Sequence, residues 1–296
     1  MTKLSSTIVV IAVLAGAAGA YYWAHGLGPF GRVSKAAQPS VASPALVPTD
    51  NTAAVSEPPA LPKTTQPNDR VPPADAGTPL RAGEILEFSA DVAKLSNVAN
   101  LRLQIVERRN FFGKNAWHLQ AFARTENPLR MMFELDDQFD SYSDVATLSS
   151  LQYEMHLNER GEKQESIQRM TTTGTELAAT NATQTRVVPG TRDPLGLMQY
   201  LRTVDWGKVR EVHGPVYDGH KLYDVRASYA GAAASVEVPA GTFTASKIDL
   251  RVFEAGVELK DAHFTLYLAD NPSRTPVLLE AVMPFATARV ALVKMK

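Results

Sequence analysis

Hydrophobic and polar residues alternate along much of the chain after residue 80. Stretches 101–105 and 264–268 each carry a large apolar residue at every second position. Because a period of two puts successive side chains on opposite faces of a strand, both stretches predict β-strands with one buried face. Turn-forming pairs such as Asp218-Gly219 separate these runs. The pattern predicts a mainly β fold, a curved antiparallel sheet of about ten to twelve strands, either an open half-barrel or sandwich-like.

One helix is predicted from about Pro194 to Val204. Asp193 can cap its first turn, and Pro194 suits the first helical position, where a missing N–H costs no hydrogen bond. Leu197, Leu201 and Val204 recur at helical spacing and give the helix one apolar face. We expect this helix to cover an open face or end of the sheet.

The first 25 residues contain a long apolar run. Residues 4–24 carry no charge, and Lys3 precedes them. About 20 apolar residues are enough to cross a bilayer as a helix, so this run predicts a membrane anchor. The alternative is a signal peptide that is cleaved after the small residues Ala18-Gly19-Ala20. Either way the rest of the chain is exported, so we expect a periplasmic protein, tethered to the inner membrane by residues 4–24 if the run is retained.

Residues 26–80 are rich in proline and alanine and poor in large apolar residues. Such a segment cannot bury enough surface to offset its ordering entropy, so it predicts a disordered linker. It acts as a spacer or recruits a proline-binding partner. Residues 81–296 then form one β-rich domain, which is long enough to bury a core of its own.

Composition and charge exclude several classes of function. The chain has a net charge of −1 and no cysteine. It therefore lacks the basic excess of nucleic-acid-binding proteins, and it cannot form disulfides, catalytic thiols or thiolate metal sites. The six histidines do not pair at metal-ligand spacing, and there is no nucleophile elbow, phosphate loop or dinucleotide fingerprint. We expect no catalytic residue, no cofactor and no metal.

Four motifs stand in order along the domain. They are Gly83-Glu84-Ile85-Leu86-Glu87-Phe88, the helix Asp193-Pro194-Leu195 to Tyr200-Leu201-Arg202, Val238-Pro239-Ala240-Gly241-Thr242-Phe243, and Arg274-Thr275-Pro276-Val277. With these motifs, residues 83–294 resemble the exported bacterial family catalogued as domain of unknown function 3108 (DUF3108). The resemblance implies a curved antiparallel sheet and a periplasmic location, but no mechanism, since the family has no established activity. By analogy of fold alone, it suggests the open half-barrels of lipoprotein carriers.

Five carboxylates fall within eleven residues, namely Glu134, Asp136, Asp137, Asp140 and Asp144. Oxygen-rich clusters can hold calcium, but this spacing is not that of a calcium loop, and no glycine supplies the required turn. The alternative is a solvated loop in which like charges repel one another, and we favour that interpretation.

A hairpin turn is predicted around residues 112–115, with Phe111 and Phe112 at its tip. Three cations flank the two rings, namely Arg108, Arg109 and Lys114. Such a tip could enter an anionic lipid surface or contact a partner, because ring burial and attraction to headgroups would add. In the alternative, one ring folds back onto the sheet and the cations only solvate the turn.

An apolar cavity is the second candidate site. A sheet that curls without closing can leave an apolar trough, and seven aromatic residues could line it. They are Phe88, Trp117, Phe133, Phe139, Tyr142, Trp206 and Phe285. In the alternative, these rings fill an ordinary core.

These observations favour a non-enzymatic, membrane-tethered periplasmic domain that binds a lipid or lipoprotein component of the envelope. The first alternative is a scaffold or assembly factor that binds another envelope protein through a sheet edge or surface. The second alternative is a hydrolase with dispersed carboxylates, because glycoside hydrolysis needs only two carboxyl groups at a suitable separation.

Overall fold

The protein is described from a computed structural model, which describes residues 78–172, 182–282 and 287–296. The predicted leader, residues 1–25, and residues 26–77 of the predicted linker lie outside the described residues. The described residues form one large sheet with two helices on it.

The first half of the domain holds β1 (Ile85–Val92), β2 (Leu95–Phe111), β3 (Lys114–Thr125), the short helix α3 (Leu129–Met132), β4 (Asp136–Asp144), β5 (Ser150–Glu159), β6 (Glu162–Thr171) and β7 (Thr183–Arg186). The second half holds α4 (Pro194–Thr203), β8 (Glu211–Tyr217), β9 (Leu222–Val238), β10 (Gly241–Glu254), β11 (Val257–Ala269), β12 (Pro276–Val282) and β13 (Thr287–Met295).

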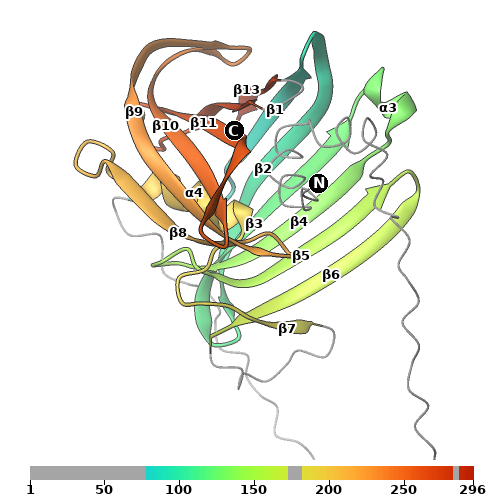
Figure 1. Ribbon diagram of the computed structural model, residues 1–296, viewed down its shortest axis with the longest axis vertical. Coiled ribbons are helices and arrows are strands. Elements are labelled where there is room, and N and C mark those ends of the chain that lie inside the picture. The colour runs from blue at the N-terminus through green and yellow to red at the C-terminus, as the bar shows by residue number, and fades with distance from the viewer. Residues whose placement is uncertain (1–77, 173–181, 283–286) are drawn as a thin grey trace, which may run out of the picture.

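All thirteen strands belong to one sheet, in the order β7-β6-β5-β4-β3-β2-β1-β13-β12-β11-β10-β9-β8. Every neighbouring pair is antiparallel except β6 and β7. The sheet curls strongly, and α4 lies within the curve (Figure 1). The predicted fold class, a curved antiparallel sheet with one covering helix, is therefore confirmed, with thirteen strands where about ten to twelve were expected.

The predicted helix is confirmed as α4, and its N-terminus forms as the sequence indicated. Asp193 is the N-cap, and its Oδ1 accepts a hydrogen bond of 2.9 Å from the Gly196 N–H. Pro194 occupies the first turn, where it removes no needed donor. Leu195 and Leu201 are buried against the sheet, so the helix is held by its apolar face.

Arg202 fixes the other end of α4 to the sheet. Its fully buried guanidinium forms a bidentate ion pair with Glu84 at 2.6 and 2.8 Å. It also donates to the Ser273 carbonyl in the loop between β11 and β12. Arg274, in the same loop, donates to the carbonyl groups of Arg202 and Val204 at the end of the helix. Segments that are far apart in sequence therefore meet at one helix terminus.

The two edges of the sheet meet at one end, here called the lower end, where the end of β8 and the β8–β9 turn contact β6. Arg192 forms a parallel bridge to Val216 of β8. Gln168 of β6 donates to the Gly219 carbonyl at 2.5 Å and accepts from the Tyr217 hydroxyl at 2.6 Å. These contacts therefore join the two edges at one end of the sheet, although β7 and β8 are not paired with each other as neighbouring strands.

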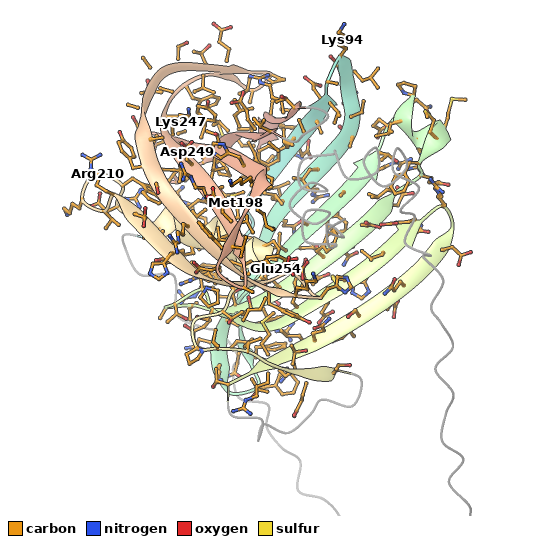
Figure 2. The ribbon with its side chains drawn as sticks, viewed as in Figure 1. Lys94, Met198, Arg210, Lys247, Asp249 and Glu254 are labelled. Carbon is orange, nitrogen blue, oxygen red and sulfur yellow. The ribbon has the colours of Figure 1, made fainter. Side chains whose placement is uncertain are left out.

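At the opposite, upper end, the β9–β10 turn is joined to β13, because the Ala240 N–H donates to the Leu292 carbonyl at 2.9 Å. The β1–β2 turn, α3 and the β9–β10 turn lie there (Figure 1). Lys94, in the β1–β2 turn, marks this end in Figure 2. The hairpin tip between β2 and β3 lies at the lower end (Figure 1).

Candidate functional site

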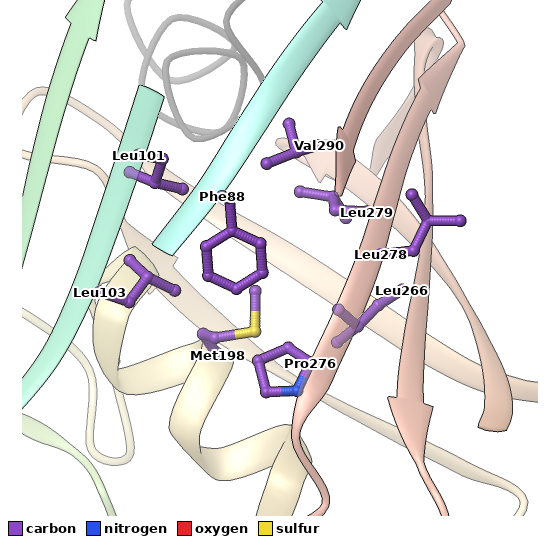
Figure 3. Close-up of a pocket in the computed structure, with 9 residues that line it drawn as sticks. All are labelled: Phe88, Leu101, Leu103, Met198, Leu266, Pro276, Leu278, Leu279 and Val290. Atoms are coloured by element: carbon purple, nitrogen blue, oxygen red, sulfur yellow. The ribbon is translucent and has the colours of Figure 1, made fainter. Parts of the chain in front are cut away.

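The face of the sheet that α4 covers is called the inner face. A small cavity of about 20 Å³ lies there beside Met198 of α4 (Figure 3). The side chains that line it are Phe88, Leu101, Leu103, Met198, Leu266, Pro276, Leu278, Leu279 and Val290. A second cavity, of about 40 Å³, lies along the same helix between Pro194 and Leu201.

Both cavities are too small for a lipid. Ligand pockets are usually about 300–1,000 Å³, and the larger cavity here is about 40 Å³. Their lining is apolar, so water has no polar partner there. The space beneath α4 is therefore packed core.

The inner face also carries small side chains, which are set among the large ones that line the cavities. Cross-strand pairs share a face, and Ala90 pairs with Ala99, while Ala123 pairs with Leu101 of the cavity wall. Six buried alanines lie on this face by the same registers and are here called the alanine floor: Ala90, Ala99, Ala121, Ala123, Ala281 and Ala288. None of them lines the two cavities beneath α4.

A carboxyl group borders the alanine floor. Asp137 of β4 pairs directly with Ala123, so it shares the inner face, and only 3% of it is exposed. Burial raises its pKa to about 7, and the charges of Glu159 and Asp136 raise it further, whereas a hydrogen bond from the Asn158 N–H opposes the rise. Asp137 can therefore gain or lose a proton near neutral pH.

Exposed apolar side chains gather at the upper end of the sheet. Met131 of α3 is 84% exposed, Met132 is 54% exposed, and Leu95 at the start of β2 is 51% exposed. α3 is held beside β2, because the Glu126 N–H donates to the Val98 carbonyl. Methionine adapts to irregular apolar partners, so this rim can contact a flexible hydrophobic molecule.

The acidic stretch is not the solvated, self-repelling loop that the sequence suggested. Most of it is strand β4, and alternation sends its carboxylates to different surroundings. Glu134 and Asp136 pair with Arg130, while Asp137 faces inward. Asp144 accepts from the backbone N–H groups of residues 146 and 147 in the following turn. The cluster is dispersed, and no group of described residues has the arrangement to hold a metal ion.

Asp140 lies on the outer face of β4 within a dense polar network. Burial alone would raise its pKa, but hydrogen bonds from His118 and Gln138, together with one from Gln120, hold it below the usual value. The His118 Nε2–Asp140 Oδ1 distance is 2.7 Å. The His118 ring also stacks on Tyr142 at 4.7 Å. This histidine is therefore fixed by neighbours on two sides.

The two rings of the β2–β3 hairpin have different roles. Phe111 is buried and stacks on Tyr142, with ring centroids 4.1 Å apart. Phe112 is 64% exposed and lies against the Arg169 guanidinium, 3.7 Å from the ring centroid. One ring therefore folds back onto the sheet, as one of the two alternatives predicted, and only Phe112 is available at the surface.

The flanking cations of the hairpin also differ in their surroundings. The Arg108 guanidinium lies over the Trp117 ring at 5.2 Å. Arg109 forms an exposed ion pair of 3.4 Å with Glu107. Lys114 is exposed at the first position of β3. The structure therefore places these three cations in distinct settings around one turn.

A serine substitution at Phe112 tests whether this tip contacts membranes. We expect Phe112→Ser to reduce binding of the full-length protein to anionic liposomes several-fold if the tip inserts its one exposed ring. Stability should fall by about 1–2 kcal/mol, because the Arg169 cation that loses the ring is itself buried. Co-sedimentation and thermal unfolding measure the two effects.

Val257→Ser is the matched control, since Val257 is 68% exposed but has Glu258 beside it rather than cations. Equal liposome binding by the wild-type, Phe112→Ser and Val257→Ser proteins would exclude a membrane role for the hairpin.

The seven aromatics of the second predicted site do not line one cavity. Phe88 lines the smaller cavity beside α4, and Phe139 is buried on the inner face. Tyr142 lies on the outer face with Phe111. Trp117, Phe133 and Trp206 are buried. Phe285 lies outside the described residues.

A buried polar cluster at the lower end has no counterpart in the sequence-based predictions. The Asp193 carboxylate accepts from the hydroxyls of Ser141 and Ser150, and its burial raises its pKa against these hydrogen bonds. The Tyr153 hydroxyl and Asp218 Oδ2 are buried without a hydrogen-bond partner in the described structure. The sequence does place serine residues, Ser141 and Ser150, in β4 and β5. However, only the folded structure shows that their hydroxyls reach Asp193, the N-cap of α4.

Neither helix in the described ranges is long and apolar enough to span a membrane.

These features define a class of protein: a curled, open, mostly antiparallel sheet around one helix, with an apolar inner face. The chain belongs to the family described as "Protein of unknown function (DUF3108)", whose sequence profile matches residues 88–293. The predicted family is thus confirmed. A search of curated proteins finds no match.

The solved structures that are similar to this chain include the following three. One is a β-barrel-like protein of domain of unknown function DUF1849 from Brucella abortus, with 10% identity, coverage of 72% of this chain and 95% of that one, and a TM-score of 0.47. A predicted lipoprotein from Parabacteroides distasonis has 13% identity, coverage of 73% and 96%, and a TM-score of 0.34. A predicted exported protein with a YmcC-like fold from Bacteroides fragilis has 10% identity, coverage of 73% and 96%, and a TM-score of 0.30.

Proposed function

We propose that this chain is a non-enzymatic binding protein of the bacterial cell envelope that holds the acyl chain of a lipid against the alanine floor. The observation that carries the proposal is the floor itself. Alanine is depleted in strands, yet six alanines share the inner face, and none of them lines the two cavities beneath α4. An alanine side chain ends at Cβ, so a face built from alanine leaves more depth within a curled sheet than a face of leucine or phenylalanine.

The rim of exposed apolar residues supports this function. Met131, Met132 and Leu95 stand at the same end of the sheet as the floor, where an acyl chain would enter. α4 fills the lower part of the inner face, so the bound chain would be confined to the upper part. The apolar run at residues 4–24 supports a location at the membrane, close to a supply of lipid.

The edges of the sheet favour this proposal over a scaffold that pairs through an edge strand. β7 has only four residues. On β8, the outward Pro215 carbonyl and Tyr217 N–H are already bonded to the backbone of Arg192, and Pro215 has no N–H to offer. Short, partly occupied edges are poor templates for another strand.

Photo-crosslinking in membranes tests the proposal. The full-length protein is reconstituted in vesicles that contain a phospholipid with a photoactivatable acyl chain, and crosslinked peptides are mapped by mass spectrometry. We expect crosslinks within residues 119–125 of β3, which include two floor alanines. Ala123→Leu should reduce them several-fold, because added methylenes occupy the acyl-chain space.

Ala234→Leu is the control, since Ala234 is an exposed alanine in β9. Crosslinks confined to residues 4–24, or equal crosslinking of residues 119–125 in the wild-type and Ala123→Leu proteins, would overturn the proposal.

A further inference from the structure

We propose that Asp137 binds the headgroup of the lipid and that this lipid carries an amine. The inference rests on the proposed function, since it names the class of ligand that the alanine floor would hold. Its basis is the position of one carboxyl group at the border of an apolar surface, with no cation beside it among the residues that the structure describes.

The position of Asp137 follows from the register of three strands. Asp137 pairs with Ala123 of the floor, which in turn pairs with Leu101. Its Oδ1 accepts from the Asn158 N–H at 2.9 Å, in place of a ladder bond between β4 and β5. No described residue donates to Oδ2. One carboxyl oxygen therefore fixes the side chain, and the other is left for a ligand.

The charges around Asp137 have the same sign as its own. Glu159 and Asp136 both oppose its ionisation, and burial does so more strongly. The nearby guanidinium groups are engaged elsewhere, because Arg130 pairs with Glu134 and Asp136, while Arg160 lies over the Phe133 ring at 5.2 Å. A buried carboxylate without a cationic partner is unfavourable, so this site lacks the cation that a ligand can supply.

A primary ammonium group meets this need. It supplies a positive charge and hydrogen-bond donors, and its pairing with a carboxylate is stronger at a site removed from water. An aminolipid would place its acyl chain on the alanine floor and its ammonium group at Asp137. A lipid whose headgroup is only anionic would meet Asp137, Glu159 and Asp136 with like charge.

Two lipid headgroups distinguish this inference from its alternatives. The full-length protein is reconstituted at pH 8 with photoactivatable phosphatidylethanolamine or phosphatidylglycerol that carries the same acyl chains. We expect crosslinks to residues 119–125 to be at least five-fold more abundant with phosphatidylethanolamine. Asp137→Asn should make the two yields equal, because it removes the charge but keeps an oxygen for the Asn158 N–H.

Asp249→Asn is the matched control, because Asp249 lies on the outer face of β10 and accepts from Thr265. It should keep the preference for phosphatidylethanolamine. A loss of fold would lower both yields together, whereas the inference concerns their ratio.

Each outcome has a separate meaning. Equal yields in the wild-type protein, or a preference that survives in Asp137→Asn, would overturn the inference while crosslinks to residues 119–125 still support acyl-chain binding. If neither lipid crosslinks to residues 119–125, the proposed function fails as well.

Discussion

Replacing Arg202 with alanine is expected to lower the free energy of unfolding by about 3–5 kcal/mol, because removal of one partner of a buried ion pair leaves the other charge uncompensated. The partner is Glu84, whose side chain is 12% exposed, while the Arg202 side chain is fully buried. The variant also leaves the Ser273 carbonyl without two donors. Urea unfolding monitored by circular dichroism measures the loss.

Arg124→Ala is the control for this prediction. Arg124 pairs with Glu126 and Asp136 at the surface, so we expect it to lose less than about 1 kcal/mol. The double variant Arg202→Met/Glu84→Leu should be more stable than Arg202→Ala, because it leaves no unpaired charge. If Arg202→Ala lowers the free energy of unfolding by less than about 1 kcal/mol, the ion pair between Arg202 and Glu84 does not hold α4 on the sheet.

The second large effect is a loss of stability as the pH rises. Asp137 has a pKa of about 7 in the folded protein, against 3.8 when it is not perturbed. Between these values the folded state binds more protons than the unfolded state, so the contribution of Asp137 to stability is fully present below about pH 4 and is lost as the pH rises through 7. The shift corresponds to about 4 kcal/mol lost across this range from this one group.

Asp137→Asn isolates that contribution. We expect this variant to match the stability of the wild-type protein at pH 4 and to exceed it at pH 8. The stability of the variant therefore falls less than that of the wild-type protein between pH 4 and pH 8. A residual fall should remain, because burial also raises the pKa values of Asp193, Asp218 and Glu159. Thermal unfolding across the pH range measures both proteins, and identical pH profiles would show that Asp137 ionises freely in the folded state.

The sequence was sufficient to predict the elements whose signals are local. Period-two alternation identified the strands, and Asp193 followed by Pro194 identified the start of α4 within one residue. The hairpin between β2 and β3 followed from its turn residues. These predictions succeeded because each depends on residues only a few positions apart.

The candidate site could not be predicted, because it depends on register between strands. Ala99, Ala121 and Ala123 take alternate positions in β2 and β3, but only their pairing places them on one face with Asp137. The same alternation disperses the acidic stretch that looked continuous in the sequence. Aromatic residues were a poor guide, since Phe139 and Tyr142 lie on opposite faces of one strand.

The motifs that carry the family resemblance are joined in the structure. Glu84 from the first motif, Arg202 from the helix motif and Arg274 from the last motif meet at the end of α4. In the remaining motif, the Ala240 N–H donates to the Leu292 carbonyl and fastens the β9–β10 turn to β13. Their shared role is to hold the helix and a hairpin onto the sheet, so they describe the scaffold and not its ligand.

The place of β13 between β1 and β12 has a consequence for how the chain matures. Ile85 and Lys296, at opposite ends of the domain, exchange backbone hydrogen bonds of 2.9 and 3.1 Å. A chain made from its N-terminus must keep the edge of β1 unpaired until β13 has been synthesised, a slow and aggregation-prone order of assembly. A stop codon just before Thr287 would therefore remove β13 and divide the sheet into two parts. β1 and β12 would then each become an unpaired edge strand.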